Sequence, residues 1–126
     1  MHRSRLTSIV IDCPEDLYDQ DREFWSDAFG QEVVSRDARF SSLRGRIGKQ
    51  GGAFIGFQKV QAHDIGIHFD IETDDVEAEV ARLRALGGKV KKRIRQHVVM
   101  QSPSGHSFCV VPVRRGDFPD GAAEWQ

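Results

Sequence analysis

The sequence contains a weak internal repeat, in which residues 8–60 and residues 68–113 follow the same pattern. In each copy a β-branched segment leads into a helix pattern, a glycine ends the helix, and shorter strand patterns follow. Three pairs of segments carry the match: residues 8–16 with 68–76, 28–33 with 85–90, and 52–56 with 105–109. Equivalent strands of a doubled fold bring equivalent positions together, so a site can be sought at matched positions.

The chain has 126 residues, and each half alone would bury only a marginal core. We therefore predict a single α+β domain over residues 1–126, with tandem βαβββ modules at about 5–60 and 65–113 and an irregular tail at 114–126. The modules are expected to form a cup-shaped mixed sheet with helices on its outer face. The opposite face is then free to carry polar residues.

Composition argues against several classes of partner. The net charge of −1 and the lack of a long apolar run predict no nucleic-acid partner and no membrane partner. The basic run at 89–95 lacks the interleaved aromatic residues of single-strand-binding surfaces, so we interpret it as a solvated edge strand. The two cysteines, Cys13 and Cys109, form no disulfide framework, which favours a cytoplasmic location.

The strand pattern is clearest at 65–72, where Ile67 and Phe69 alternate with His68 and Asp70. A first strand is predicted at 6–13. Asp74 is predicted to cap the second helix, with Glu77 completing a capping box.

Several segments together resemble the glyoxalase/bleomycin resistance/extradiol dioxygenase superfamily, also called the vicinal oxygen chelate superfamily, and its glyoxalase-like subgroup in particular. These segments are residues 11–15 leading into 24–30, the strand 68–71, the hairpin 102–112, and the tail 117–121 followed by Trp125. The resemblance implies paired βαβββ units, a homodimer and a cup for a small molecule. Enzymes of this superfamily hold a divalent metal in the cup, whereas non-catalytic relatives use it to sequester drugs.

The four metal-ligand positions of the superfamily fall on Ser8, Gly56, His68 and Cys109 of this chain. Of these, only His68 is a usual ligand; Gly56 has no side chain, and Cys109 replaces a hard carboxylate. A catalytic metal site needs about three protein ligands and an open position. We therefore expect no metal cofactor at these positions. An unusual site of His68, Cys109 and a displaced carboxylate is the residual alternative.

The predicted function is the binding of a small organic ligand in the cup by a protein with a degenerate metal site. The alternatives are a metal-dependent lyase, isomerase or dioxygenase of the glyoxalase type with a non-standard metal site, and a partner domain with a vestigial cup. Whether the protein is an enzyme is left open, with His68 as the best catalytic candidate. The predicted ligand-binding residues are His68, Asp70, Ser8, Gly56 and Cys109.

Other side chains near the expected cup have more ordinary interpretations. Cys109 has an apolar context, which is typical of a small buried residue and not of a nucleophile. Asp12 and Glu72 occupy matched positions, where they could form paired carboxylates or cap nearby backbone. Phe40, Phe54, Phe57 and Trp125 could line an apolar wall of the cup, but for most of them we expect ordinary core and interface packing.

Overall fold

The computed structural model describes residues 1–126 and contains two successive βαβββ units, as predicted. The first unit consists of β1 (His2–Pro14), α1 (Tyr18–Phe29), β2 (Val33–Ser35), β3 (Phe40–Leu43) and β4 (Phe54–Val60). The second consists of β5 (Gly66–Thr73), α2 (Val76–Ala85), β6 (Lys89–Ile94), β7 (His97–Gln101) and β8 (Ser107–Pro112). Two short 3₁₀ helices, Glu15–Leu17 and Ala62–Asp64, and a final strand β9 (Ala123–Trp125) complete the chain.

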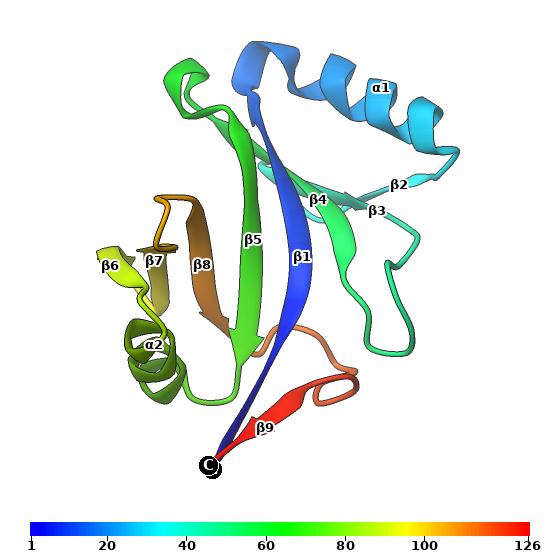
Figure 1. The fold of residues 1–126 in the computed structure, drawn as a ribbon. Coiled ribbons are helices and arrows are strands. Elements are labelled where there is room, and N and C mark those ends of the chain that lie inside the picture. Colours follow the sequence, from blue (N-terminus) through cyan, green and yellow to red (C-terminus); the bar gives the residue numbers. More distant parts are fainter.

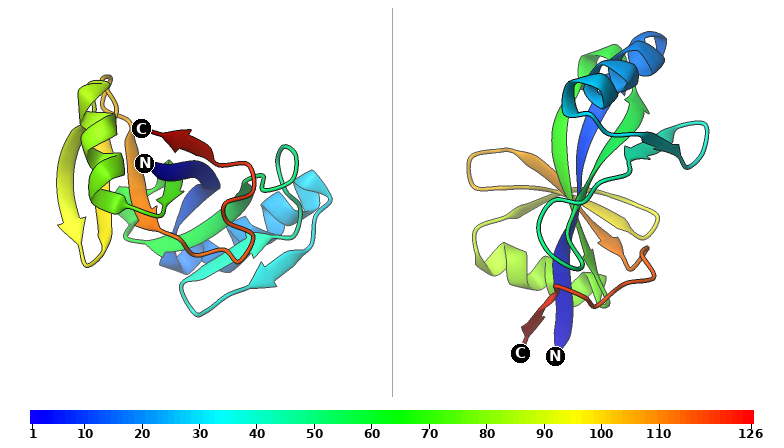
Figure 2. Two further views of the ribbon diagram at one scale, coloured as in Figure 1. Left: turned by 90° about the horizontal axis from the view of Figure 1, so that it is seen from below. Right: turned by 90° about the vertical axis from the view of Figure 1, so that its right-hand side faces the viewer.

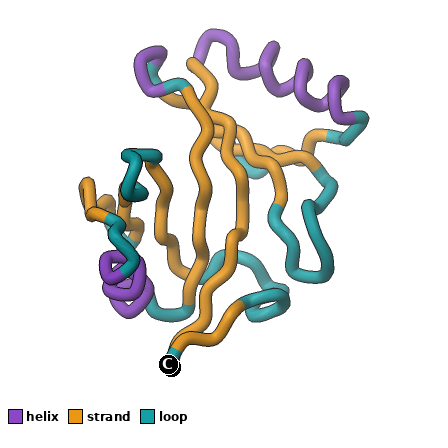
Figure 3. Tube along the Cα trace, in the orientation of Figure 1, coloured by secondary structure: helices purple, strands orange, loops and turns teal.

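All strands belong to one mixed sheet with the order β2-β3-β4-β1-β5-β8-β7-β6, and β9 pairs with β1. The long strands β1 and β5 lie antiparallel at its centre (Figure 1). On the outer side of each, β4 pairs parallel with β1 and β8 pairs parallel with β5. The basic run forms β6, which is an edge strand as expected. The two units therefore share one continuous sheet, and α1 and α2 lie at opposite ends of it (Figures 1 and 3).

The two helices cover the same face of the sheet, which we call the helix face. Alternate strand residues point to this face and pack with one residue of each helix in two apolar clusters. Cys13, Leu43 and Phe57 pack with Tyr18 of α1, and Val98, Met100 and Val110 pack with Val80 of α2. The opposite face, which we call the cup face, carries the intervening residues of β1 and β5. The curl of the sheet between the helices is visible in Figure 2. Neither helix has the length and apolar character needed to cross a membrane.

The N-terminus of α2 differs from the prediction. Asp75, and not Asp74, caps the helix by accepting a hydrogen bond from the Ala78 N–H at 3.0 Å. Asp74 instead accepts a hydrogen bond from the backbone N–H of Arg3 at 2.8 Å. The predicted capping box is thus wrong, because β1 begins at His2 and brings a competing donor to Asp74.

The prediction of an irregular tail is also wrong at its end, because Ala123–Trp125 forms β9 on the extended start of β1. The Trp125 indole N–H donates to Ser4 Oγ at 2.9 Å, and the Arg82 guanidinium lies 3.8 Å from the centroid of the indole ring. Both contacts hold Trp125 on the side of α2.

A buried ion pair links β1, β5 and the tail. Glu72 is fully buried, and its carboxylate accepts a hydrogen bond from Arg5 Nε at 2.6 Å. The same carboxylate accepts the backbone N–H groups of Arg114 and Arg115 at 3.0 and 3.3 Å. Arg5 also contacts Asp117 in the tail at 2.7 Å. Glu72 therefore anchors the segment after β8 and does not pair with another carboxylate.

We expect the substitution Glu72→Gln to lower the free energy of unfolding by about 3 kcal/mol, because it leaves the buried Arg5 charge without its main partner. Urea unfolding measures the change. The matched control is Glu77→Gln, which removes an exposed carboxylate paired with Arg93 and should cost less than about 1 kcal/mol. Equal losses in the two variants would contradict the anchoring role of Glu72.

Candidate functional site

The pairing of β1 with β5 builds a polar cluster at the centre of the cup face. In this register Ser8 lies opposite Asp70 and Val10 opposite His68, and such paired side chains share one face. His68 Nδ1 is 2.7 Å from Asp12 Oδ2, and its Nε2 is 3.3 Å from Asp70 Oδ1. The imidazole is therefore held between a carboxylate of each module, in what we call the Asp12–His68–Asp70 cluster.

The environment of the His68 imidazole favours its charged form. Burial by itself lowers the pKa of His68, since only 15% of the side chain is exposed. The hydrogen bonds and charges of Asp12 and Asp70 outweigh burial and raise the pKa to about 9. The second oxygen of Asp12, Oδ1, is buried and has no hydrogen-bond partner, so an acceptor remains free beside the ring.

Asp70 connects the cluster to neighbouring side chains. Ser8 Oγ donates to Asp70 Oδ2 at 3.2 Å, and Arg114 Nη1 lies 3.6 Å from the same oxygen. Arg114 also contacts the His97 ring at 3.1 Å, and burial together with the Arg114 charge lowers the pKa of His97. The sequence analysis missed Arg114 and His97, because no local pattern shows that the segment after β8 turns back onto the sheet.

The other two predicted site residues, Cys109 and Gly56, lie in β8 and β4. Cys109 lies opposite Asp70 in the parallel β5–β8 pair, and burial with the nearby charges of Asp70 and Asp12 raises the pKa of its thiol to about 12. A neutral thiol is a poor nucleophile. Gly56 lies in β4, where an added Cβ would stand 3.0 Å from Cζ of Phe40. Ser8, His68, Asp70 and Cys109 thus gather together, whereas Gly56 lies against the Phe40 ring.

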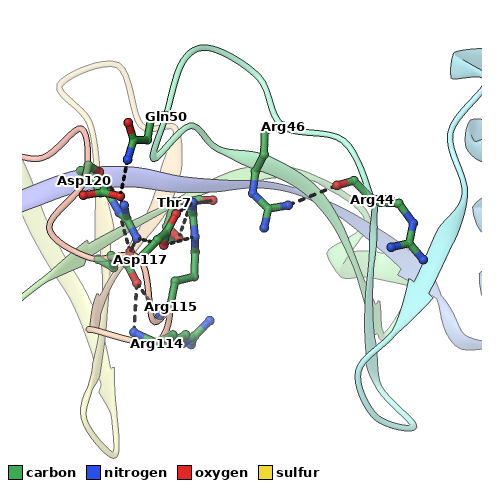
Figure 4. Close-up of polar contacts among 10 residues, drawn as sticks. Thr7, Arg44, Arg46, Gln50, Arg114, Arg115, Asp117 and Asp120 are labelled. Atoms are coloured by element: carbon green, nitrogen blue, oxygen red, sulfur yellow. Dashed lines mark hydrogen bonds and ion pairs between the residues drawn. The ribbon is translucent and has the colours of Figure 1, made fainter.

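A pocket of about 380 Å³ adjoins the cluster on the cup face. We call it the arginine pocket, and its lining is Thr7, Ser8, Arg36, Asp37, Phe40, Phe54, Arg114 and Arg115. Ser8 and Arg114 belong to this lining and also contact Asp70, so the pocket opens directly beside the cluster. Figure 4 shows Arg114 and Arg115 close to Thr7 and Asp117 at this end of the sheet.

A larger cavity of about 860 Å³ lies on the opposite side of the sheet, between α2, the tail and the loop before β4. Leu6, Phe69, Leu86 and Phe108 contribute to its walls. It is wider but mostly apolar, and the convergent polar groups expected of a specific site lie in the arginine pocket. We therefore take the smaller pocket as the candidate site.

Two of the four aromatic residues considered for the apolar wall lie in the arginine pocket. Phe40 and Phe54 line the arginine pocket, but Phe57 is fully buried in the cluster under α1. Phe54 and Phe57 are three residues apart in a strand, which places them on opposite faces. Trp125 lines the cavity on the helix face, because β9 carries it to that side.

Comparison with known proteins identifies the family of this chain. The model of the glyoxalase-like domain family matches residues 8–111, which includes both βαβββ units. The chain belongs to this family. No protein with a curated description matches the sequence. The resemblance seen in the sequence is thus confirmed at the level of family and fold.

Three solved structures show the same fold at low sequence identity. A structure titled NAD-dependent benzaldehyde dehydrogenase from Legionella pneumophila has a TM-score of 0.63 and 9% identity, and the match covers 85% of this chain and 98% of that one. A glyoxalase/bleomycin resistance protein/dioxygenase superfamily member from Vibrio splendidus 12B01 has a TM-score of 0.51 and 18% identity, with 87% and 99% covered. The Mn(II)-bound glyoxalase from Novosphingobium aromaticivorans has a TM-score of 0.52 and 21% identity, with 86% of this chain and 40% of that chain covered.

The residues of this glyoxalase-like domain do not complete the metal site of the superfamily, but they fit a different site that uses a displaced carboxylate. Ser8 and Gly56 leave the superfamily's ligand set incomplete, as the sequence indicates. The displaced carboxylate, however, exists in Asp70: donor atoms of His68, Asp70 and Cys109 all lie within 4.8 Å of one another. Asp12 Oδ2 lies 2.7 Å from His68 Nδ1, and a metal-bound histidine commonly donates its other ring N–H to a carboxylate in this way, which fixes the orientation of the ring. Nitrogen, oxygen and sulfur donors together suit a borderline ion such as Zn²⁺.

The raised pKa of His68 predicts a pH-dependent contribution to stability. In chelator-treated protein, charged His68 stabilises the fold fully below its ordinary pKa of 6.5, and this contribution is lost as the pH rises through about 9. The native protein should therefore exceed His68→Gln in unfolding free energy by more at pH 6 than at pH 10, two values that lie roughly on either side of that window. Urea unfolding at both values measures it.

The matched control for this experiment is His63→Gln, because the His63 side chain is 80% exposed and should make no such contribution. A difference for His68→Gln that stays constant or grows toward high pH would contradict the assignment of a charged imidazole.

Proposed function

We propose that this glyoxalase-like domain binds a small organic molecule on its cup face, in the arginine pocket beside the Asp12–His68–Asp70 cluster. The observation that carries the proposal is the meeting of two features in one place. A half-open pocket with the aromatic walls Phe40 and Phe54 lies next to a polar cluster that has a free buried acceptor. Small-molecule sites combine apolar walls with a few fixed polar groups in this way.

The cluster provides hydrogen-bonding groups in fixed orientations. His68 cannot rotate freely, since both ring nitrogens face carboxylates, and Asp70 is further held by Ser8. Groups that are ordered before a ligand arrives lose little entropy on binding. The pocket therefore suits recognition of a ligand that places one polar group against Ser8 and Asp70.

Nuclear magnetic resonance tests this proposal through the location of bound fragments. We expect a small-molecule fragment library to shift the amide signals of cup-face residues such as Ser8 and Asp70 and not those of Leu6 or Phe69. His68→Ala should weaken the binding of cup-face fragments about tenfold, because Asp70 loses its charged partner. The exposed His63→Ala is the control. Fragments that bind only to the helix face would contradict the proposal.

A second candidate function is metal-dependent catalysis of the glyoxalase type, and the grouping of His68, Asp70 and Cys109 favours it. These three residues would hold the ion and leave a position open for substrate. A bound ion would act as a Lewis acid on a substrate oxygen. The chain's own contribution would be to orient that substrate in the arginine pocket and to hold His68 through Asp12.

Metal analysis separates the two functions. Protein purified without chelator should contain no stoichiometric transition metal if the pocket binds its ligand alone. One equivalent of zinc, manganese, nickel or iron that is lost in both His68→Ala and Cys109→Ala, but kept in Cys13→Ala, would show the metal site that the second function requires and would contradict metal-free binding. Cys13 is the matched control because it is a free cysteine buried under α1, on the face of the sheet opposite the cluster.

The homodimer and the cytoplasmic location stay predictions. Large apolar side chains of the helix face remain exposed, including Ile67 and Phe69 in β5 and Leu86 after α2. A second copy of the chain would cover this surface and leave the arginine pocket open. Both cysteines are free, which agrees with a reducing compartment.

A further inference from the structure

Three guanidinium groups surround one aromatic ring in the arginine pocket. The Phe54 ring, which is 7% exposed, has Arg36 at 5.4 Å, Arg46 at 5.2 Å and Arg115 at 5.5 Å from its centroid. The pocket lining itself contains three arginines, because Arg114 joins Arg36 and Arg115 there, whereas Arg46 reaches the ring from outside the lining. Like charges repel one another at such separations, so this arrangement needs compensating negative charge nearby.

The chain itself compensates only part of this charge. Arg115 forms an ion pair with Asp117 at 2.6 Å, and Arg114 lies 3.6 Å from Asp70. In contrast, the only hydrogen bond of the Arg36 side chain is to Ser42 Oγ, at 3.5 Å, and that of Arg46 is to the Arg44 carbonyl, at 3.2 Å (Figure 4 shows the latter). Neither of them forms an ion pair with a carboxylate.

The pocket lining contains one carboxylate, Asp37, against three arginines, and it forms no ion pair with Arg36. Its Oδ1 accepts the backbone N–H groups of Arg39 and Phe40 at 2.8 and 2.9 Å, which shapes the turn between β2 and β3. The arginine pocket therefore retains a positive excess beside an aromatic wall. Arg side chains bind carboxylates and phosphates through paired hydrogen bonds, and partial enclosure strengthens such bonds.

We propose, on the basis of the function proposed above, that the ligand of this pocket is a small organic oxyanion. Its carboxylate or phosphate group is bound by Arg36, and its aromatic or apolar body lies against Phe40 and Phe54. The negative end is thus kept at Arg36, while the end nearest Ser8 and Arg114 meets the Asp12–His68–Asp70 cluster. A neutral ligand of the same shape would leave the positive excess uncompensated.

Isothermal titration calorimetry with four probes tests this inference. Benzoate and phenyl phosphate carry the two oxyanions, benzamide is the neutral isostere, and inorganic phosphate lacks the apolar body. We expect at least one of the two aromatic anions to bind about tenfold more tightly than both benzamide and inorganic phosphate. The aromatic anion that binds more tightly shows whether the pocket prefers a carboxylate or a phosphate. Binding should weaken as the salt concentration rises.

Matched variants locate the effect. Arg36→Gln should weaken the preferred anion about tenfold, whereas Arg44→Gln, which removes an exposed arginine paired with Glu32, should change affinity less than about twofold. Arg36 is exposed, so its loss should leave the protein folded.

Three results would overturn the inference: equal binding of benzamide and benzoate, equal effects of the two substitutions, or no binding of either aromatic anion. The proposed function fails separately, when fragments of any charge avoid the cup face.

Discussion

The antiparallel pairing of β1 with β5 is the constraint on which the site depends. It joins the two βαβββ units into one sheet and sets Ser8 against Asp70 and Val10 against His68. A shift of one residue in this register would turn each side chain of one strand to the other face. The register is held at one end by the buried Arg5–Glu72 pair and is interrupted between Leu6 and Ser8, so that Arg5 and Ser8 both face the cup.

The repeat in the sequence was enough to predict the strand–helix order and the shared face of His68 and Asp70, because these follow from local periodicity. It also identified Ser8 and Cys109 as neighbours of His68. Local patterns could not predict that Asp12 of the first module bonds to His68, since this depends on the register between distant strands. Local alternation alone sets Phe57 on the face opposite Phe54, whereas the position of Trp125 depends on the pairing of β9 with β1, which no local pattern shows.

The cup face combines two electrostatic regions that oppose each other. The cluster holds two carboxylates around one imidazolium, while the neighbouring pocket is lined by three arginines, of which Arg36 has no acidic partner. Arg114 and Ser8 stand at the boundary, because each lines the pocket and also contacts Asp70. A ligand that is negative at one end and able to donate a hydrogen bond at the other would match this gradient. Fold membership alone does not imply such a preference.

A crystal structure of the protein soaked with 4-bromobenzoate tests most directly whether the arginine pocket is the ligand site, because anomalous scattering locates the bromine atom. We expect one ordered molecule on the cup face, with its carboxylate at Arg36 and its ring between Phe40 and Phe54. Bromine found only in the helix-face cavity, near Phe69 and Phe108, would contradict the assignment of the arginine pocket as the ligand site.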